Sequence, residues 1–293
     1  MRRSSLLKVL ALMSMGVMPQ STFADGATVG AEEAVLRVNI AGRQRMLSQR
    51  MVKAACLMAL DIDTTSAFDQ LTQSYDLFVG SSRALRDGDA ALGLSPETYT
   101  PVLEVQRQAD RPWSIYRLVI ENGIDNAEIT TAELAALDDA ALDLLRELNH
   151  AVFVTAQSHA AAAPKVSLGL AVTVDVAGRQ RMLSQRAVKE ACLMQVAAAP
   201  EQQAERLYDT IDLFERSLNA LREGHPTAGI IAPPNPEVAR KLAEVADLWR
   251  PIKARLTDAA KTGTLSTQDL GRLAIDVEPL LRTMNEAVGL YGA

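Results

Sequence analysis

Aromatic residues are scarce in this sequence: they make up 4% of its 293 residues, whereas hydrophobic residues as a whole make up 48%. Alanine and leucine dominate instead, which is typical of packed helices and disfavours a β-sandwich. Histidine is also rare. His150, His159 and His225 are scattered along the chain and do not recur at related positions. We therefore expect no metal centre, and no pattern in the sequence indicates a cofactor.

Beyond its first 24 residues, the chain lacks an apolar run long enough to span a membrane. Residues 1–24 are typical of a secretory signal peptide, because three basic residues precede a short apolar stretch at Val9–Met18 and Thr22-Phe23-Ala24 resembles a cleavage site. The alternative is a membrane anchor, but the apolar stretch is about half the length that a spanning helix needs. We therefore expect an exported, periplasmic protein that is soluble after cleavage.

Two further features of the sequence argue against nucleic-acid binding and against catalysis. Removal of residues 1–24 leaves 27 basic residues against 36 acidic ones, a net charge of −9. Nucleic-acid binding needs clustered positive charge, so we expect no nucleic-acid partner. A catalytic constellation is also missing: Ser48 and Ser184 are equivalent in the repeat described next, but no histidine accompanies both of them. We therefore do not expect an enzyme.

What the sequence does contain is a long internal repeat. The ten letters of Ala41–Arg50 return unchanged at Ala177–Arg186, an offset of 136 residues. Extended to Met58 and Met194, the match covers sixteen of eighteen positions, and weaker matches continue at the same offset towards the end of the chain. The chain is therefore interpreted as a signal peptide followed by two copies of one module, at 25–163 and 164–293.

Helical periodicity runs through both copies, and no strand pattern is present. The helices expected in the first copy are Ala31–Leu60, Ala67–Arg86, Pro101 to about Glu121, and Thr130 to about Ala163. Those expected in the second copy are Val172–Ala199, Gln202–Glu223, Pro236–Ala260 and Ser266–Leu290. Asn122-Gly123 is expected to break the third helix. The predicted fold is all-α: two tandem up-down four-helix bundles that form an intramolecular pseudo-dimer. Pairing between chains is the alternative.

The first helix of each copy has two opposed faces to bury. At about 100° per residue, one face carries apolar residues for the module's own core: Ile40, Leu47, Met51, Ala54 and Met58. The opposite face, which we call the seam, recurs in both copies: Gly42, Arg45, Gln49, Val52 and Cys56, then Gly178, Arg181, Gln185, Val188 and Cys192. Four further arginines lie beside it: Arg43, Arg50, Arg179 and Arg186. The seam is expected to pack against its twin across a pseudo-twofold axis.

Such an axis would bring Arg45 and Arg181 towards each other. Two guanidiniums facing across a partly buried seam are unfavourable unless an anion lies between them. Their planar forks suit a small oxyanion whose oxygens lie in a plane, and Gly42 and Gly178 would let the two backbones approach. The residues alone thus indicate an oxyanion clamp. The alternative is that the arginines are solvated, or paired with acids elsewhere in the bundles.

The other repeated residues allow simpler interpretations. Cys56 and Cys192, the only cysteines, occupy equivalent seam positions and could form a disulfide across the axis, or they could be two small buried apolar residues. Trp113 and Trp249 are expected to pack in or beside the cores rather than to form a ligand cage. Asn149 and Asn285 are expected to be buried amides that fix helix register.

The segment Asn39–Met51 resembles the signature helix of the PilJ/NarX-type sensory domain. This domain is the periplasmic input module of type IV pilus chemotaxis transducers and of nitrate/nitrite-sensing histidine kinases. The resemblance implies a four-helix bundle whose first helices meet at a dimer interface, where nitrate sensors hold the anion between a glycine and an arginine of each subunit. That glycine falls on Gly42 and Gly178, and that arginine on Arg45 and Arg181.

The combined hypothesis is an exported sensory protein that binds a small oxyanion, such as nitrate or nitrite, or another small ligand. Its expected site is Gly42, Arg45, Gln49, Gly178, Arg181 and Gln185. Unlike the sensors, the sequence has no second transmembrane helix and no kinase or methyl-accepting segment, so it would present its signal to a membrane-bound transducer or histidine kinase. The alternative is a structural module that has lost ligand binding and docks on a transducer or envelope complex.

Overall fold

The structure is a computed structural model that describes residues 30–160 and 168–291. Within these residues the chain forms α-helices and one short 3-10 turn, η2 at Pro226–Ala228. The first module contains α1 (Ala31–Ala59), α2 (Thr64–Asp87), α3 (Thr100–Asn126) and α4 (Thr131–His159). The second contains α5 (Leu168–Leu193), α6 (Pro200–Glu223), α7 (Pro236–Thr262) and α8 (Thr267–Gly289). The all-α prediction is confirmed, whereas the predicted signal peptide at 1–24 lies outside the described residues.

Local chemistry explains where several helices begin. Thr130 and Glu133 form a capping box at the start of α4, in which each side chain accepts from the backbone N–H of the other residue. The side chain of Ser266 accepts from the amide of Asp269 at the start of α8, and that of Asn235 accepts from Val238 at the start of α7. These caps bind N–H groups that have no partner within the helix.

One predicted helix boundary is wrong. Asn122-Gly123 does not end α3, which continues to Asn126 and stops at Ala127, a residue with a left-handed φ of 53°. Gly123 is buried instead against Ile129 of the following loop: a Cβ on this glycine would lie 2.1 Å from the Ile129 Cδ1 atom. The glycine is therefore needed for close packing rather than to break the helix.

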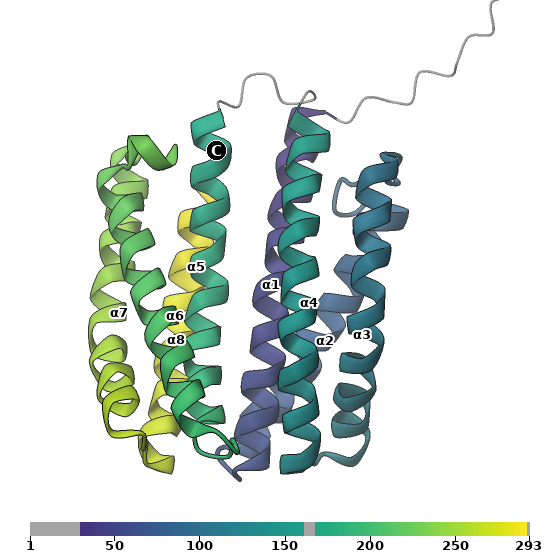
Figure 1. Ribbon diagram of the computed structural model, residues 1–293. Coiled ribbons are helices and arrows are strands. Elements are labelled where there is room, and N and C mark those ends of the chain that lie inside the picture. Colours follow the sequence, from purple (N-terminus) through teal and green to yellow (C-terminus); the bar gives the residue numbers. More distant parts are fainter. Residues whose placement is uncertain (1–29, 161–167, 292–293) are drawn as a thin grey trace, which may run out of the picture.

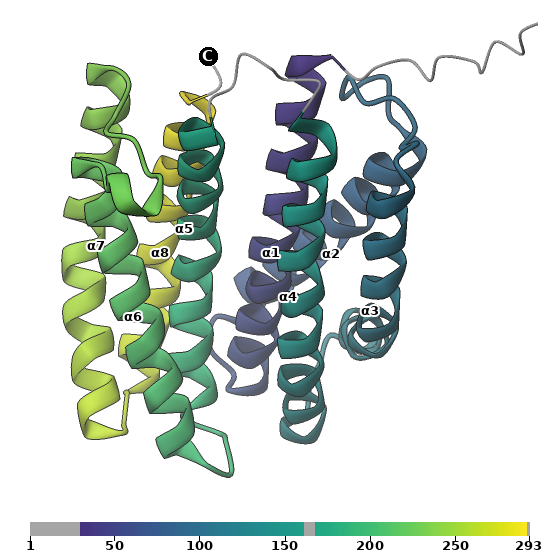
Figure 2. The same cartoon turned by 45° about the horizontal axis from the view of Figure 1, so that its top comes forward.

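The two modules lie side by side, with α1 and α5 between the outer helices (Figures 1 and 2). Within the first module, α1 packs against α2 and α4; within the second, α5 packs against α6 and α8; and α1 packs against α5 along the interface. One apolar core runs through both modules. The predicted pairing is therefore within one chain, and the two copies form a pseudo-dimer.

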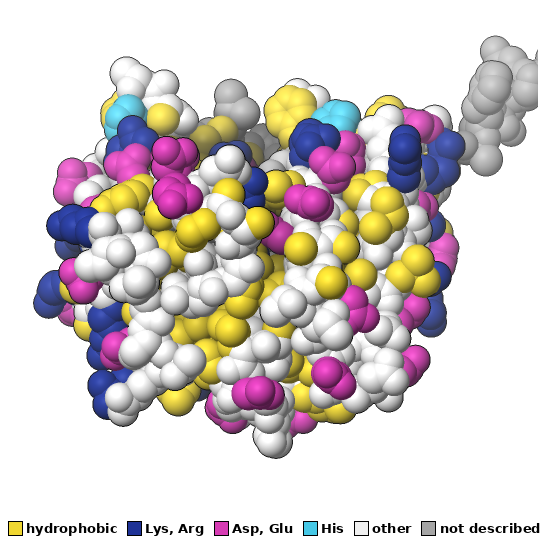
Figure 3. All heavy atoms as spheres, turned by 60° about the horizontal axis from the view of Figure 1, so that its bottom comes forward, with side chains coloured by type: hydrophobic (Ala, Val, Ile, Leu, Met, Phe, Trp, Pro, Cys, Tyr) yellow, Lys and Arg dark blue, Asp and Glu magenta, His cyan; other side chains and the backbone are white. Residues whose placement is uncertain are grey.

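The up-down order brings the first and last helix ends of both modules to one end of the molecule. The start of α1, the end of α4, the start of α5 and the end of α8 lie at this end, which is the top of Figure 1. On the opposite end, acidic and apolar side chains are interspersed, and basic side chains gather mainly at its left-hand edge (Figure 3). In the part of the chain that the structure describes, no helix is long and apolar enough to cross a membrane.

A disulfide joins the two central helices near the end opposite the start of α1 and the end of α8. Cys56 of α1 and Cys192 of α5 are bonded, with their Cα atoms 6.2 Å apart, and both residues are fully buried. The bond fixes the register in which the two seams face each other.

Candidate anion site between the central helices

The seam brings two glycines and two arginines together. A Cβ on Gly42 would lie 3.3 Å from the Arg45 Nη2 atom and 3.6 Å from the Arg181 Nη2 atom. A Cβ on Gly178 would lie 3.3 Å from Arg181 Nη2 and 3.8 Å from Arg45 Nη2. Each guanidinium thus lies against the glycines of both helices, at a distance where a Cβ atom would be in contact with it. The pseudo-twofold pairing expected from the helical periodicity is present.

Both arginines are held in the same way on one side. Arg45 Nη1 donates to Asn149 Oδ1 at 3.3 Å, and Arg181 Nη1 donates to Asn285 Oδ1 at 3.2 Å. The expectation that Asn149 and Asn285 are buried is wrong, because both residues are exposed. The arginines themselves are only 2% and 4% exposed. The asparagines therefore orient the guanidiniums from the surface, and the arginine pair lies just beneath it.

The other side of the site breaks the symmetry. Arg45 Nη2 donates to the carboxylate of Asp175 at 2.8 Å, whereas Arg181 Nη2 donates to the amide oxygen of Asn39 at 3.0 Å. Positions 39 and 175 are equivalent in the repeat, with asparagine in one copy and aspartate in the other. The alternative of acid-paired arginines thus holds for Arg45, while Arg181 has no ion pair within the described ranges. Of the two buried guanidiniums, only that of Arg45 contacts a carboxylate.

This asymmetry appears in the electrostatics. Burial lowers the pKa of Arg45, but the charge of Asp175 opposes this effect. Burial, together with the charges of Arg45 and Arg43, lowers the pKa of Arg181 to about 10. Burial alone would raise the pKa of Asp175, yet its two arginine neighbours hold that pKa below its usual value. The site therefore holds an ionised Asp175 and a buried cation, Arg181, that has no anionic partner of its own among the residues described.

Buried amides beside the arginines lack partners. Gln49 and Gln185, one turn further along α1 and α5, are 1% and 0% exposed. Among the described residues, neither the amide nitrogen nor the amide oxygen of Gln185 has a hydrogen-bond partner, and the same holds for Gln49 Oε1 and Arg45 Nε. Leaving buried polar groups unpaired costs about 1–3 kcal/mol each. A ligand or ordered water at the seam would satisfy them.

The four neighbouring arginines have different environments. Arg50 pairs with Glu278 at 2.7 Å, Arg179 with Asp175, and Arg186 with Glu190 at 2.5 Å. Arg43 is half-buried, and its Nε atom has no partner among the described residues. Of the four, only Arg43 lowers the pKa of Arg181. It adds positive charge to the candidate site, whereas the carboxylates bind the other three.

Two buried ion pairs across the module interface are absent from the sequence-based hypothesis. Lys53 of α1 reaches Glu278 of α8 at 2.7 Å, and Lys189 of α5 reaches Asp138 of α4 at 3.0 Å. The repeated lysines were a signal, since Lys53 and Lys189 occupy equivalent positions. Their acids are not equivalent in the repeat, and nothing in the spacing pairs them.

Other features do not form a site. The hydroxyls of Ser48 and Ser184 donate to the backbone carbonyls of Arg45 and Arg181, at 2.9 and 2.8 Å, so neither is arranged as a nucleophile. In the described ranges, no group of three or more His, Cys, Asp or Glu side chains is placed to hold a metal ion.

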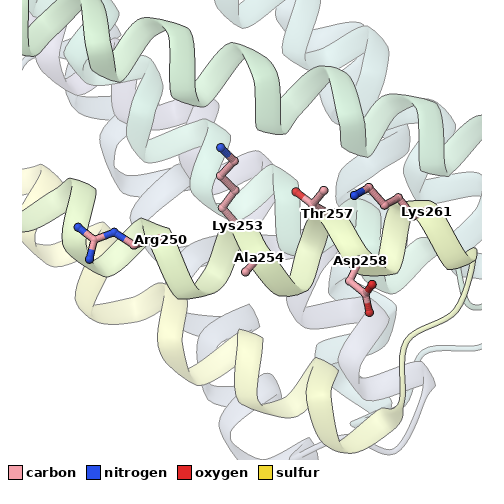
Figure 4. A pocket seen from close by; sticks show the side chains of 6 residues that line it. All are labelled: Arg250, Lys253, Ala254, Thr257, Asp258 and Lys261. Carbon is pink, nitrogen blue, oxygen red and sulfur yellow. The ribbon is translucent and has the colours of Figure 1, made fainter.

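A shallow hollow follows the outer face of α7 (Figure 4). A single helix lines it, with side chains that point in different directions. Two of its three cations are bound to acids, Lys253 to Glu215 and Arg250 to Asp247. It is a solvated helix face rather than an anion site.

Comparison with known proteins identifies the family. Residues 31–139 and 164–271 each match the family described as "Type IV pili methyl-accepting chemotaxis transducer N-term", or PilJ. The matched segments start at or just before α1 and α5, and both contain the glycine–arginine seam. The protein belongs to this family and carries two copies of its domain, which is a sensory domain, typically periplasmic.

A relative supports this assignment. The methyl-accepting chemotaxis protein McpN of Pseudomonas aeruginosa is 32% identical to the chain over 121 residues, which are 41% of this chain. The matched region spans only 22% of the length of McpN. The similarity therefore concerns the sensory module and not the whole chemotaxis protein.

Proposed function

We propose that the protein is an exported periplasmic sensor that binds one small, planar, singly charged oxyanion, such as nitrate or nitrite, between α1 and α5. Arg181 carries the proposal: it is a buried cation that faces Arg45 without an acid of its own. Of the two buried guanidiniums, only Arg181 lacks a carboxylate in the part of the chain that the structure describes, and one negative charge would compensate it. An anion with more charge would crowd Asp175, which already neutralises Arg45.

The geometry suits oxygens that lie in a plane. Guanidiniums donate in a flat fork, and hydrogen bonds between such forks and anions are stronger than neutral ones. The buried, unpartnered amide of Gln185 would supply a further donor next to the arginines. Because Gly42 and Gly178 have no side chains, both guanidiniums lie close to the two helix backbones, where an anion would meet them. Gln49 occupies the position equivalent to Gln185 on the other helix.

The same arrangement provides a route for the signal. The disulfide pins α1 and α5 near one end, eleven residues from the arginines, which is about 16 Å along a helix. An anion between the arginines removes their repulsion and draws the helices together on the other side of that fixed point. We therefore expect the movement at the end where α1 begins and α8 ends, where a membrane-bound transducer or histidine kinase would read it.

The test is thermal unfolding of the mature protein with nitrate, nitrite, chloride and sulfate at equal ionic strength. An anion at 100 times its dissociation constant stabilises the native state by about 2.7 kcal/mol. We expect a shift that is specific to the planar, singly charged anions and is lost in Arg45→Ala/Arg181→Ala. Arg146→Ala/Arg282→Ala is the matched control, because these exposed arginines are also equivalent in the two copies. If none of the anions changes the unfolding temperature specifically, the proposal is wrong.

A docking module is the second candidate. Large apolar side chains are exposed on three helices: Leu118 on α3 is 65% exposed, Phe153 on α4 57%, and Ile275 on α8 63%. Such side chains suit helix-to-helix contact with a partner. If the anion panel is flat and Leu118→Ser/Phe153→Ser abolishes binding to an envelope transducer, this candidate takes precedence.

A further inference from the structure

The two copies of the module differ in how their bundles are filled. In the first copy, a cavity of about 320 Å³ lies between α2 and α3 and reaches α1 and α4. Its walls include Ser82, Gln106 and Ala109. At the equivalent positions, the second copy has larger apolar side chains, Leu218, Leu242 and Val245, which are at most 3% exposed.

The packing of the helices agrees with this difference. In the second copy α6 and α7 pack along each other more extensively than α2 and α3 do in the first. Two neighbouring positions on one face of α3 and one position on α2 are small or polar in the first copy only, so the cavity results from several substitutions rather than from one. Its volume lies in the range of about 300–1,000 Å³ that is usual for small-ligand sites.

One wall of the cavity is aromatic. The indole of Trp113 stacks on Phe78, with ring centroids 4.2 Å apart, and the ring centroids of Tyr116 and Tyr75 lie 5.6 and 6.1 Å from it. Trp113 is only half-buried, whereas its counterpart Trp249 is 3% exposed in the core of the second copy. Trp113 packs against the core, as expected, and it also lines the cavity. An indole and a phenyl ring at the wall favour a planar aromatic ligand.

The polar groups of the cavity are open to a ligand. Gln106 Oε1 is buried and has no hydrogen-bond partner among the described residues, so it calls for a donor. Arg86 donates from Nη2 to Asp110 at 3.1 Å, but its buried Nε atom is also unpartnered. Arg83, at the exposed rim, has no ion pair within the described ranges. Together these groups offer an acceptor inside and cationic donors at the rim.

We propose that the cavity between α2 and α3 is a second ligand site, for a single-ring aromatic carboxylate that bears a hydroxyl group. Its ring would stack on Trp113, its hydroxyl would donate to Gln106 Oε1, and its carboxylate would meet Arg83 and Arg86. The site belongs to the first copy alone and does not depend on the anion clamp. The protein would thus sense two classes of molecule.

The experiment uses Trp113 as the reporter. The sequence has two tryptophans, so Trp249→Phe leaves Trp113 as the only one. In this background, 4-hydroxybenzoate is titrated while tryptophan emission is followed, and 4-hydroxycyclohexanecarboxylate serves as the probe of equal charge without an aromatic face. We expect a saturable change with the aromatic probe and at least tenfold weaker binding of the non-aromatic one. No saturable change with 4-hydroxybenzoate would overturn the proposal.

A filled variant tests the location. Ser82→Leu/Gln106→Leu/Ala109→Val gives the first copy the side chains of the second, so it should fold and unfold at or above the parent temperature while binding 4-hydroxybenzoate at least tenfold more weakly. Should this triple variant not fold, Gln106→Leu alone is expected to weaken binding in the same direction. Arg181→Ala should leave aromatic binding unchanged, because it alters only the clamp. Undiminished binding in a folded, filled variant would overturn the proposal.

Discussion

Replacing Asn39 with aspartate is the sharpest change that the structure suggests, because it copies the environment of one arginine to the other. Arg45 is paired with Asp175, whereas Arg181 meets only the amide of Asn39. In Asn39→Asp, both guanidiniums would have a carboxylate. We predict that this variant is more stable than the parent without anion and no longer gains stability from the anion.

The magnitude follows from the state of Arg181. Burial and its neighbouring arginines lower its pKa to about 10, and a lowering of this size corresponds to roughly 3 kcal/mol. A base whose pKa is lowered by folding destabilises the fold at every pH below that pKa, so the penalty is present in full at pH 7. A carboxylate about 4 Å away contributes about 4 kcal/mol at an effective dielectric constant of 20, and its own burial takes back part of this gain. We expect a net gain of about 2 kcal/mol, or roughly 4–8 °C in the unfolding midpoint.

The assay is calorimetric unfolding at pH 7 in low salt, with and without nitrate. Asp175→Asn is the matched control, since it exchanges the same two residue types at the equivalent position in the opposite direction. It should lower stability without anion and increase the stabilisation that nitrate provides. If Asn39→Asp is neutral or destabilising, or responds to nitrate as the parent does, Arg181 does not carry an uncompensated charge and the reasoning fails.

Three other predictions concern the same interface. Cys56→Ala/Cys192→Ala should lose about 4–5 kcal/mol in urea unfolding, because the disulfide closes a loop over a separation of 136 residues; an unchanged midpoint would contradict this. Burial, opposed by the charge of Glu278, lowers the pKa of Lys53 to about 8. The unfolded state therefore binds more protons between pH 8 and 10, so the free energy of unfolding should rise by about 2 kcal/mol over this window and stay flat in Lys53→Met. Gly42→Ala should keep or gain up to about 1 kcal/mol through helix propensity, yet lose the anion-induced shift, since its Cβ would lie 3.3 Å from a guanidinium nitrogen.

The architecture could be predicted from the sequence because the internal repeat and the helical periodicity indicate the same arrangement of helices. Identical seam residues at one offset required two equivalent helices, and a helix with two faces to bury required a partner on each side. The contact of Arg45 with Gly178 and of Arg181 with Gly42 follows from this arrangement. The predicted break at Asn122-Gly123 was wrong because the sequence alone does not distinguish a glycine that permits close packing from a glycine that ends a helix.

The balance of charge at the site between Arg45 and Arg181 could not be predicted from the sequence. Asn39 and Asp175 are equivalent in the repeat, but only the structure shows that each contacts the arginine of the other copy, at 3.0 and 2.8 Å. Likewise, Asn149 and Asn285 recur inside apolar helices, which favoured burial, although they lie at the exposed edge. The cavity of the first copy arises where the residues of the two copies differ. The sequence analysis searched for residues that recur in both copies, so it did not find the cavity.

The proposed function requires that one planar, singly charged oxyanion binds between Arg45 and Arg181. A crystal structure of the mature protein grown with nitrate tests it most directly. We expect one planar anion per chain, in contact with both guanidiniums and the Gln185 amide, while the Arg45–Asp175 ion pair is kept. A seam that holds only water under saturating nitrate, or nitrate bound elsewhere on the molecule, would contradict it.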